Sequence, residues 1–98
     1  MPGIDPKSVV VASDGALATS LEDEVVVYND ETESYQGLTG IGPDVWESIQ
    51  EPTEVREVQR RVVESYDVDP ERGERDVLEF LQELAEYDLL IEVDDERD

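Results

Sequence analysis

Residues 38–49 read LTGIGPDVWESI, and the spacing of the apolar residues changes within this stretch. Ahead of it, apolar and polar residues alternate as in strands, and behind it apolar residues recur at helical spacing. Gly42-Pro43 is typical of a helix start, because proline is favoured at the first helical position. Val45, Trp46 and Ile49 then share one face of a short helix. The sequence therefore predicts an α+β domain with strands first and helices second.

Three strands are predicted before this stretch. Residues 17–21 alternate with period two, and residues 25–28 (VVVY) are β-branched and aromatic, which is the strongest strand signal in the chain. Residues 34–38 (SYQGL) form a weaker third strand. The short polar turns between them predict an antiparallel meander. Residues 9–12 (VVVA) form either a short strand or a lead-in to the meander, and the sequence leaves this open.

Two more helices are predicted after the short one. Thr53 is expected to cap the first of them. Its apolar stripe is made of Val55, Val58, Val62 and Tyr66. Asp69-Pro70 opens the last helical region, whose main run is residues 76–88. Residues 89–93 are a last strand or a packed tail, and the acidic residues 94–98 are expected to be solvated.

The last helix carries a wide apolar stripe. At 100° per residue its core-facing side consists of Val77, Phe80, Leu81, Leu84 and Tyr87. Leu78 and Ala85 widen this stripe to roughly half of the circumference. The added edge either packs on the sheet or on the tail, or it lines a groove.

The third predicted strand has an unprotected free edge, which fits the groove interpretation of the last helix. A last strand in a meander lies at a sheet edge, where its unpaired backbone groups can pair with another strand. Residues 34–38 contain neither a charge nor a proline to protect that edge, and Gly37 weakens the strand. The edge could take an extended peptide, be protected by its shortness, or serve in a homodimer.

The composition limits the chemistry of the chain. Its 98 residues are enough for one domain with one modest core. It has no cysteine and no histidine, so disulfides, thiolate or imidazole metal ligands, and Cys or His catalysis are excluded. The clusters of acidic residues match no calcium-binding loop. We therefore expect a binding protein without cofactor or metal, and not an enzyme.

The charge is the strongest compositional signal. Twenty-eight acidic residues face seven basic ones, which gives a net charge of −21. We interpret this as a surface adapted to high salt, because the Debye length falls to about 3 Å at molar ionic strength. The acidity argues against nucleic acid, since the only basic cluster is Arg56, Arg60 and Arg61. No membrane span or signal peptide is visible, so a cytoplasm of high salt content is the expected location.

Several short motifs, in their order and spacing, resemble the PqqD family of peptide chaperones, which act in pyrroloquinoline quinone and related modified-peptide pathways. Residues 38–49 resemble its strand-to-helix signature, and residues 53–58 (TEVREV) its second helix start. Residues 76–84 (DVLEFLQEL) match its "Asp-Val-x-x-Phe-Leu-x-x-Leu" helix, and residues 89–91 resemble its closing "Gly-Leu-Val". The likeness covers residues 17–93. Asp88 stands where the family often has glycine.

The resemblance implies a fold and a site. The fold would be winged-helix-like, a three-stranded antiparallel sheet followed by three helices, in a domain spanning residues 17–93 after a flexible segment of residues 1–16. The leader segment of a ribosomally made precursor peptide would add to the third strand, beside the third helix. It would then be presented to a modifying enzyme such as a radical SAM enzyme. By position, the peptide-binding residues would be Tyr35, Gln36, Gly37, Leu78, Leu81, Gln82 and Ala85.

Two alternatives to a peptide chaperone stay open. A winged-helix DNA-binding or regulatory domain has a similar topology, but it needs a basic recognition helix. A structural dimerisation module would use the same open strand edge.

Overall fold

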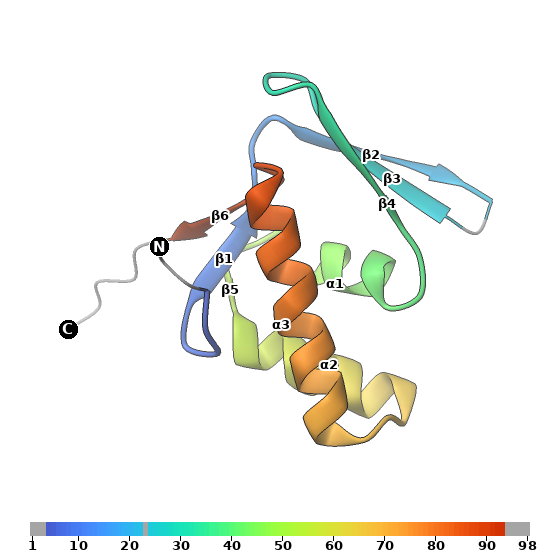
Figure 1. Ribbon diagram of the computed structural model, residues 1–98, viewed down its shortest axis with the longest axis vertical. Coiled ribbons are helices and arrows are strands. Elements are labelled where there is room, and N and C mark those ends of the chain that lie inside the picture. Colours follow the sequence, from blue (N-terminus) through green and yellow to red (C-terminus); the bar gives the residue numbers. More distant parts are fainter. Residues whose placement is uncertain (1–3, 23, 94–98) are drawn as a thin grey trace.

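The computed structural model describes residues 4–22 and 24–93 (Figure 1). In order along the described chain, the elements are β1 (Val9–Ala12), β2 (Ala16–Leu21), β3 (Glu24–Asn29), β4 (Ser34–Leu38), α1 (Gly42–Ser48), β5 (Thr53–Glu54), α2 (Val55–Tyr66), α3 (Pro70–Glu86) and β6 (Leu90–Val93). The predicted α+β class is confirmed, with an antiparallel meander ahead of three helices. The winged-helix arrangement stays an expectation.

The meander forms a sheet with the order β2-β3-β4. Its middle strand, β3, pairs antiparallel with both neighbours, and Val27 lies opposite Gln36 of β4. Val27 is fully buried beneath the sheet. Because side chains alternate across a strand, its neighbour Tyr28 points to the outer face. There Tyr28 is paired with Leu17 on one side and Tyr35 on the other, and all three side chains are exposed.

A second sheet, which the sequence did not predict, has the order β5-β1-β6. Its central strand is β1, in which Val9 pairs with Glu54 of β5 and with Val93 of β6. Val10 is fully buried, and Ile4 belongs to the same core. The segment expected to be flexible thus contains β1, for which β6 supplies a partner strand. Residues 94–98, expected to be solvated, lie outside the described residues.

The helices complete the core beneath the meander. The stripe predicted for α2 is buried at Val55, Val58 and Val62, whereas Tyr66 at its end is exposed. Thr53 does not cap α2, contrary to expectation. It lies in β5, where its hydroxyl donates to the carbonyl of Ser48 at 3.0 Å, and Glu54 occupies the cap position.

The third helix starts where the sequence predicted. The Asp69 side chain accepts a hydrogen bond from the backbone N–H of Arg72 at 3.3 Å, and Pro70 is the first helical residue. Three residues of the predicted stripe are fully buried: Val77, Leu81 and Leu84. Figure 1 shows α3 in front, with the β2-β3-β4 sheet above and to its right. The helix thus lies close to the sheet whose last strand is β4.

Candidate functional site: an open strand edge beside a helix

The edge strand β4 has one partner and one open side among the described residues. It pairs only with β3, so alternate backbone N–H and C=O groups of residues 34–38 point away from the sheet. Along β4, Leu38 is buried and Gln36 is half-buried, whereas Tyr35 is 69% exposed on the outer face. An extended peptide could therefore pair with β4 without displacing any element of the described fold.

In the described part of the chain, the most extensive packing of α3 is against α2 and β6, and that of β4 is against β3. The side chain of Phe80 reaches from α3 toward the end of β4. A methyl group built on Gly42, just after β4, would lie 3.3 Å from Phe80 Cζ and 3.0 Å from Leu38 Cβ. Phe80 therefore marks the flank of α3 that faces β4.

A shallow hollow lies on this flank of α3. Its volume is about 310 Å³, and its lining consists of Ile41, Asp76, Glu79, Phe80 and Glu83. Ile41 and Phe80 are half-buried and apolar, while the three acidic residues are exposed. We call the open edge of β4 together with this hollow the edge groove. It offers backbone pairing on one side, and apolar contact with an acidic rim on the other.

A hydrogen bond from a buried side chain ties the sheet to the residue that follows α3. Asn29 at the end of β3 is 4% exposed, and its Nδ2 donates to the carbonyl of Asp88 at 2.7 Å. The Ser13 hydroxyl donates to the same carbonyl at 2.9 Å. Asp88 follows α3 with a φ of 61°, a left-handed conformation that glycine adopts most readily. These bonds tie the end of β3 and the segment before β2 to the residue that follows α3.

The structure places the predicted peptide-binding residues in two different regions. Tyr35, Gln36 and Gly37 lie together on the open edge of β4. The predicted residues of α3 do not lie in the hollow. Leu81 is fully buried in the core, and Gln82 donates from Nε2 to the carbonyl of Ile4 at 3.2 Å.

The helical rotation between residues explains why the predicted residues of α3 lie outside the hollow. Gln82 is two residues from Phe80, which separates their directions by about 160° around the helix axis. Leu78 and Ala85 are half-buried beside the core, on the Gln82 side of the stripe. The sequence showed that the stripe was wide, but not which of its flanks faces β4. The residues that line the hollow, which the sequence did not assign to the peptide, are Ile41, Asp76, Glu79, Phe80 and Glu83.

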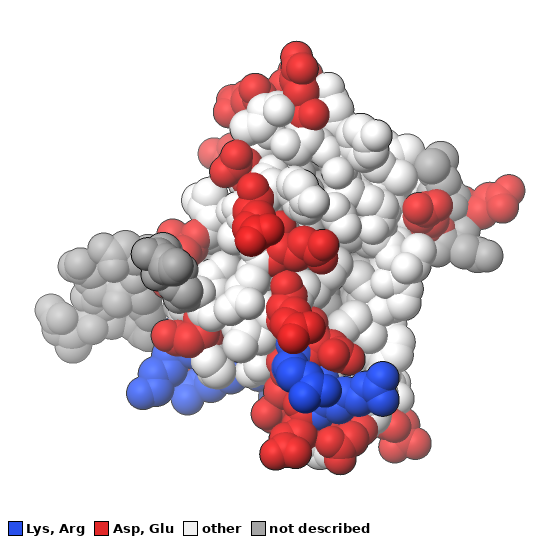
Figure 2. All heavy atoms as spheres, in the orientation of Figure 1, with Lys and Arg blue, Asp and Glu red and all other residues white. Residues whose placement is uncertain are grey.

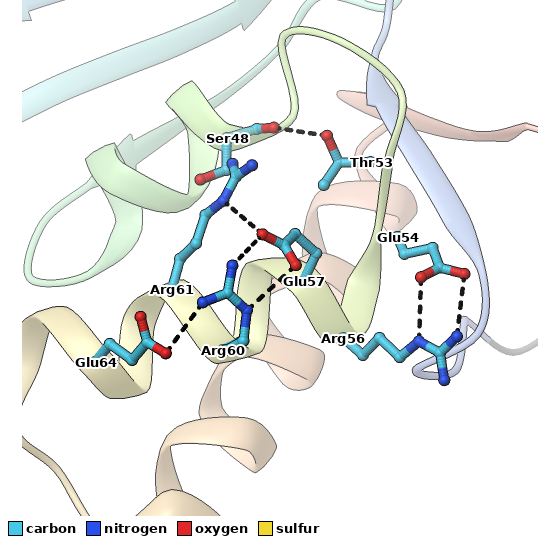
Figure 3. A network of polar contacts seen from close by, with 8 residues as sticks. All are labelled: Ser48, Thr53, Glu54, Arg56, Glu57, Arg60, Arg61 and Glu64. Carbon is cyan, nitrogen blue, oxygen red and sulfur yellow. Dashed lines mark hydrogen bonds and ion pairs between the residues drawn. The ribbon is translucent and has the colours of Figure 1, made fainter.

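The arginine cluster of α2 is engaged in ion pairs (Figure 3). Arg60 pairs with Glu57 and, at 3.0 Å, with Glu64, while Arg61 pairs with Glu57 at 3.3 Å. Arg56 pairs with Glu54 at 3.1 Å. The hydrogen bond from Arg60, with help from both arginine charges, holds the pKa of Glu57 below its ordinary value of 4.5. These contacts leave α2 with little positive charge for phosphate groups.

A second hollow, of about 400 Å³, lies between α1 and α2. Tyr66 lines it and donates from its hydroxyl to Asp44 Oδ2 at 2.5 Å. This hydrogen bond, assisted by partial burial and by the negative charge of Asp44, raises the pKa of Tyr66 above its ordinary value of 10.0. The wall also contains Glu47 and Arg61, so it carries charges of both signs. The contact between Tyr66 and Asp44 ties the end of α2 to α1.

The described residues offer neither a metal site nor a membrane-spanning helix. In the described ranges, 4–22 and 24–93, no group of three or more acidic, histidine or cysteine side chains is arranged to hold a metal ion. Among the helices of the same ranges, none is both long enough and apolar enough to cross a membrane.

Comparison with known proteins identifies the class to which this fold and edge belong. Residues 24–90 match the family model described as "Coenzyme PQQ synthesis protein D (PqqD)". The chain belongs to the PqqD family. No functionally curated protein matches it.

Two solved structures are similar to the chain. One, described as "TbiB1 in Complex with the TbiA(beta) Leader Peptide", is 32% identical with a TM-score of 0.75, over 87% of this chain and 99% of that one. The other, "Lasso peptide synthetase B1 complexed with the leader peptide", is 13% identical with a TM-score of 0.72, over 84% of this chain and 96% of that one. The second likeness shows the fold alone. The predicted resemblance to the PqqD family is thereby confirmed.

Proposed function

We propose that this domain is a non-catalytic peptide chaperone that binds the leader segment of a ribosomally made precursor peptide. The leader adds as a strand to β4 and lies in the edge groove. The observation that carries this proposal is the open, uncharged edge at residues 34–38 beside the Phe80 flank of α3. The 32% identical TbiB1, solved with a leader peptide, supports it.

Strand addition suits a peptide that must be recognised and then passed on. Main-chain hydrogen bonds supply affinity for any extended segment, and side-chain pockets supply specificity. Of the residues predicted from the sequence, Tyr35, Gln36 and Gly37 keep their role in backbone pairing. We assign the side-chain contacts to Ile41, Phe80 and Glu83, because these residues line the groove whereas Leu81 and Gln82 are occupied elsewhere.

The bound leader is presented to a modifying enzyme, and a radical SAM enzyme is the type that the family resemblance implies. The outer face of the β2-β3-β4 sheet stays free when a strand adds to β4. It carries the exposed row Leu17, Tyr28 and Tyr35, which a second protein could cover. The expected location is a cytoplasm of high salt content, on the grounds of the −21 net charge.

A DNA-binding domain and a homodimer, the two alternatives, require different surface features. A DNA-binding domain needs free basic side chains on a helix, whereas the arginines of α2 are paired with Glu54, Glu57 and Glu64. A homodimer through β4 would occupy the peptide edge, so it would compete with the peptide. No observation favours either alternative over the chaperone.

Backbone amide shifts of the full chain test the proposal. Peptides are first selected on the chain from a library of random dodecapeptides, and a selected peptide is then titrated into the ¹⁵N-labelled protein. We expect shifts at residues 34–38 and along residues 76–87, with smaller ones from a scrambled peptide. Shifts confined to α2, or shifts produced by duplex DNA in place of peptide, would discard the proposal.

A further inference from the structure

We infer that the peptide bound in the edge groove is cationic, with a lysine or arginine two residues from an apolar anchor on the side that faces α3. This inference rests on the proposed function and specifies the chemistry of its ligand.

The α3 side of the groove combines an apolar floor with unneutralised acid. Phe80 and Ile41 supply the floor, and Glu79 and Glu83 stand beside them. None of the five ion pairs found within residues 4–22 and 24–93 involves Glu79 or Glu83, and Asp76 has one distant partner, Arg72, at 3.9 Å. In Figure 2 acidic side chains follow the front face along α3, with basic ones near the lower end. An ammonium or guanidinium group is the natural partner for this rim.

The outer side of the edge also carries a carboxylate. Glu24 begins β3, and its side chain crosses diagonally to β4. There its Oε2 lies only 2.8 Å from the position that a Cβ on Gly37 would take. Glu24 is in none of the ion pairs of the described residues. Because Gly37 has no side chain, this carboxylate lies over the edge strand itself. A strand added to β4 would have acid on both of its faces.

The spacing of the groove residues matches that of a strand. Alternate residues of an extended peptide lie about 6.8 Å apart on one face. Phe80 and Glu83 are three residues apart on α3, which separates them by about 4.5 Å along the axis and about 60° around it, so the ends of their side chains lie further apart than the rise alone. A peptide lying along α3 can therefore place an apolar side chain on Phe80 and, two residues away, a basic side chain beside Glu83. This spacing yields the predicted apolar-x-basic pattern.

A general preference for cations, caused by the net charge of −21, must be separated from this local one. The general attraction depends on the net charge, whereas each single acid acts mainly within the Debye length of about 10 Å at 0.1 M salt. Removing any two acids changes the net charge by the same amount. Only acids in the groove can change the preference for a basic residue at one peptide position.

The test uses selected dodecapeptides and two matched double variants of the full chain. The groove variant is Glu79→Gln with Glu83→Gln. The control variant is Glu51→Gln with Glu92→Gln, which removes the same charge from exposed positions outside the hollow. Urea unfolding confirms that both variants fold. Binding is measured at about 0.1 M and about 1 M KCl.

We expect selected peptides to be enriched in lysine or arginine two residues from an apolar position. The groove variant should bind them roughly fivefold to tenfold more weakly than the unchanged chain at low salt, and the control variant within about twofold. Replacing the peptide's basic residue by glutamine should remove the difference between the variants. The difference should also shrink at high salt.

Two results would overturn the inference in distinguishable ways. Peptides that shift the β4 amides but show no basic enrichment, with equal affinity for both variants, would refute the cationic ligand and leave the proposed function standing. If no selected peptide shifts the β4 amides, the proposed function fails, and this inference fails with it.

Discussion

The carboxylate of Glu24 lies over the α-carbon of Gly37, so a methyl group added to Gly37 would stand 2.8 Å from Glu24 Oε2. The backbone of Gly37 is not in the left-handed region, so alanine can adopt its conformation. The crowding atom is the end of a flexible side chain and can move away. This contact is therefore a matter of side-chain placement and not of backbone strain.

The replacement Gly37→Ala should consequently be tolerated. Glycine inside a strand costs about 0.5–1 kcal/mol relative to alanine, so we expect the free energy of unfolding to stay equal or rise by up to that amount. Urea unfolding checks this. A loss of more than about 1 kcal/mol would show that Glu24 has no other position available.

Gly42→Ala is the matched comparison and should lower the free energy of unfolding. Its methyl group would meet Leu38 Cβ at 3.0 Å and Phe80 Cζ at 3.3 Å inside the packed core. Overpacking of this kind costs about 1–3 kcal/mol. We also expect weaker peptide binding, because Phe80 would be pushed into the groove. Unchanged stability and affinity would contradict the close packing of Gly42 against Phe80.

Asn29→Ala should lower stability by about 1–3 kcal/mol, because it removes the partly buried hydrogen bond from a buried amide to the carbonyl of Asp88. Its Oδ1 also accepts from the backbone N–H of Glu31 at 2.9 Å. Ser13→Ala removes the other bond to the Asp88 carbonyl from a more exposed position and should cost less than about 1 kcal/mol. Urea unfolding of the two variants makes the comparison. Equal costs would mean that Asn29 does not hold the sheet to α3.

Tyr66 should ionise at a higher pH than a tyrosine without such a hydrogen bond. The hydrogen bond to Asp44 raises its folded-state pKa above 10.0, so the bond stabilises the fold below pH 10.0. That contribution is lost as the pH rises through the folded-state pKa. Ultraviolet titration of tyrosinate should show a late component that Tyr66→Phe removes and Asp44→Asn moves to lower pH. A late component that persists in Tyr66→Phe would assign it to another tyrosine.

The free energy of unfolding should rise with KCl concentration. The net charge of −21 is spread over a small domain, and the repulsion between its acidic residues weakens as the Debye length falls from about 10 Å at 0.1 M to about 3 Å at 1 M. Urea is the suitable denaturant because it carries no charge. Equal stability at the two salt concentrations would contradict adaptation to high salt.

Short sequence patterns predicted the helices and strands in which they occur. The helical spacing of Val55, Val58 and Val62 identified the buried face of α2, and Asp69-Pro70 identified the start of α3. These features depend on residues within a turn or two of one another. The open edge at residues 34–38 was predicted for the same reason, because the meander is a chain of neighbouring strands.

Contacts between distant parts of the chain were not predictable in this way. The strand β1 pairs with β5 and β6, which lie far from it in the sequence, and no local signal joins Val9 to Val93. That pairing brings Ile4 to Gln82 and covers the flank of α3 that the sequence had assigned to the peptide. The opposite flank, with Phe80, faces β4 because α1 places Gly42 against it. The open strand edge was therefore predictable from the sequence, whereas the side of α3 on which the hollow lies was not.

Hydrogen exchange at the amides of β4 tests strand addition most directly. In the free protein, the amides of residues 34–38 that point away from β3 should exchange rapidly, because the described fold gives them no partner. Saturation with a selected dodecapeptide should slow their exchange at least about tenfold, with little change on the edge strands β2 and β6. Protection that appears on β2 or β6, or no added protection on β4, would contradict the account.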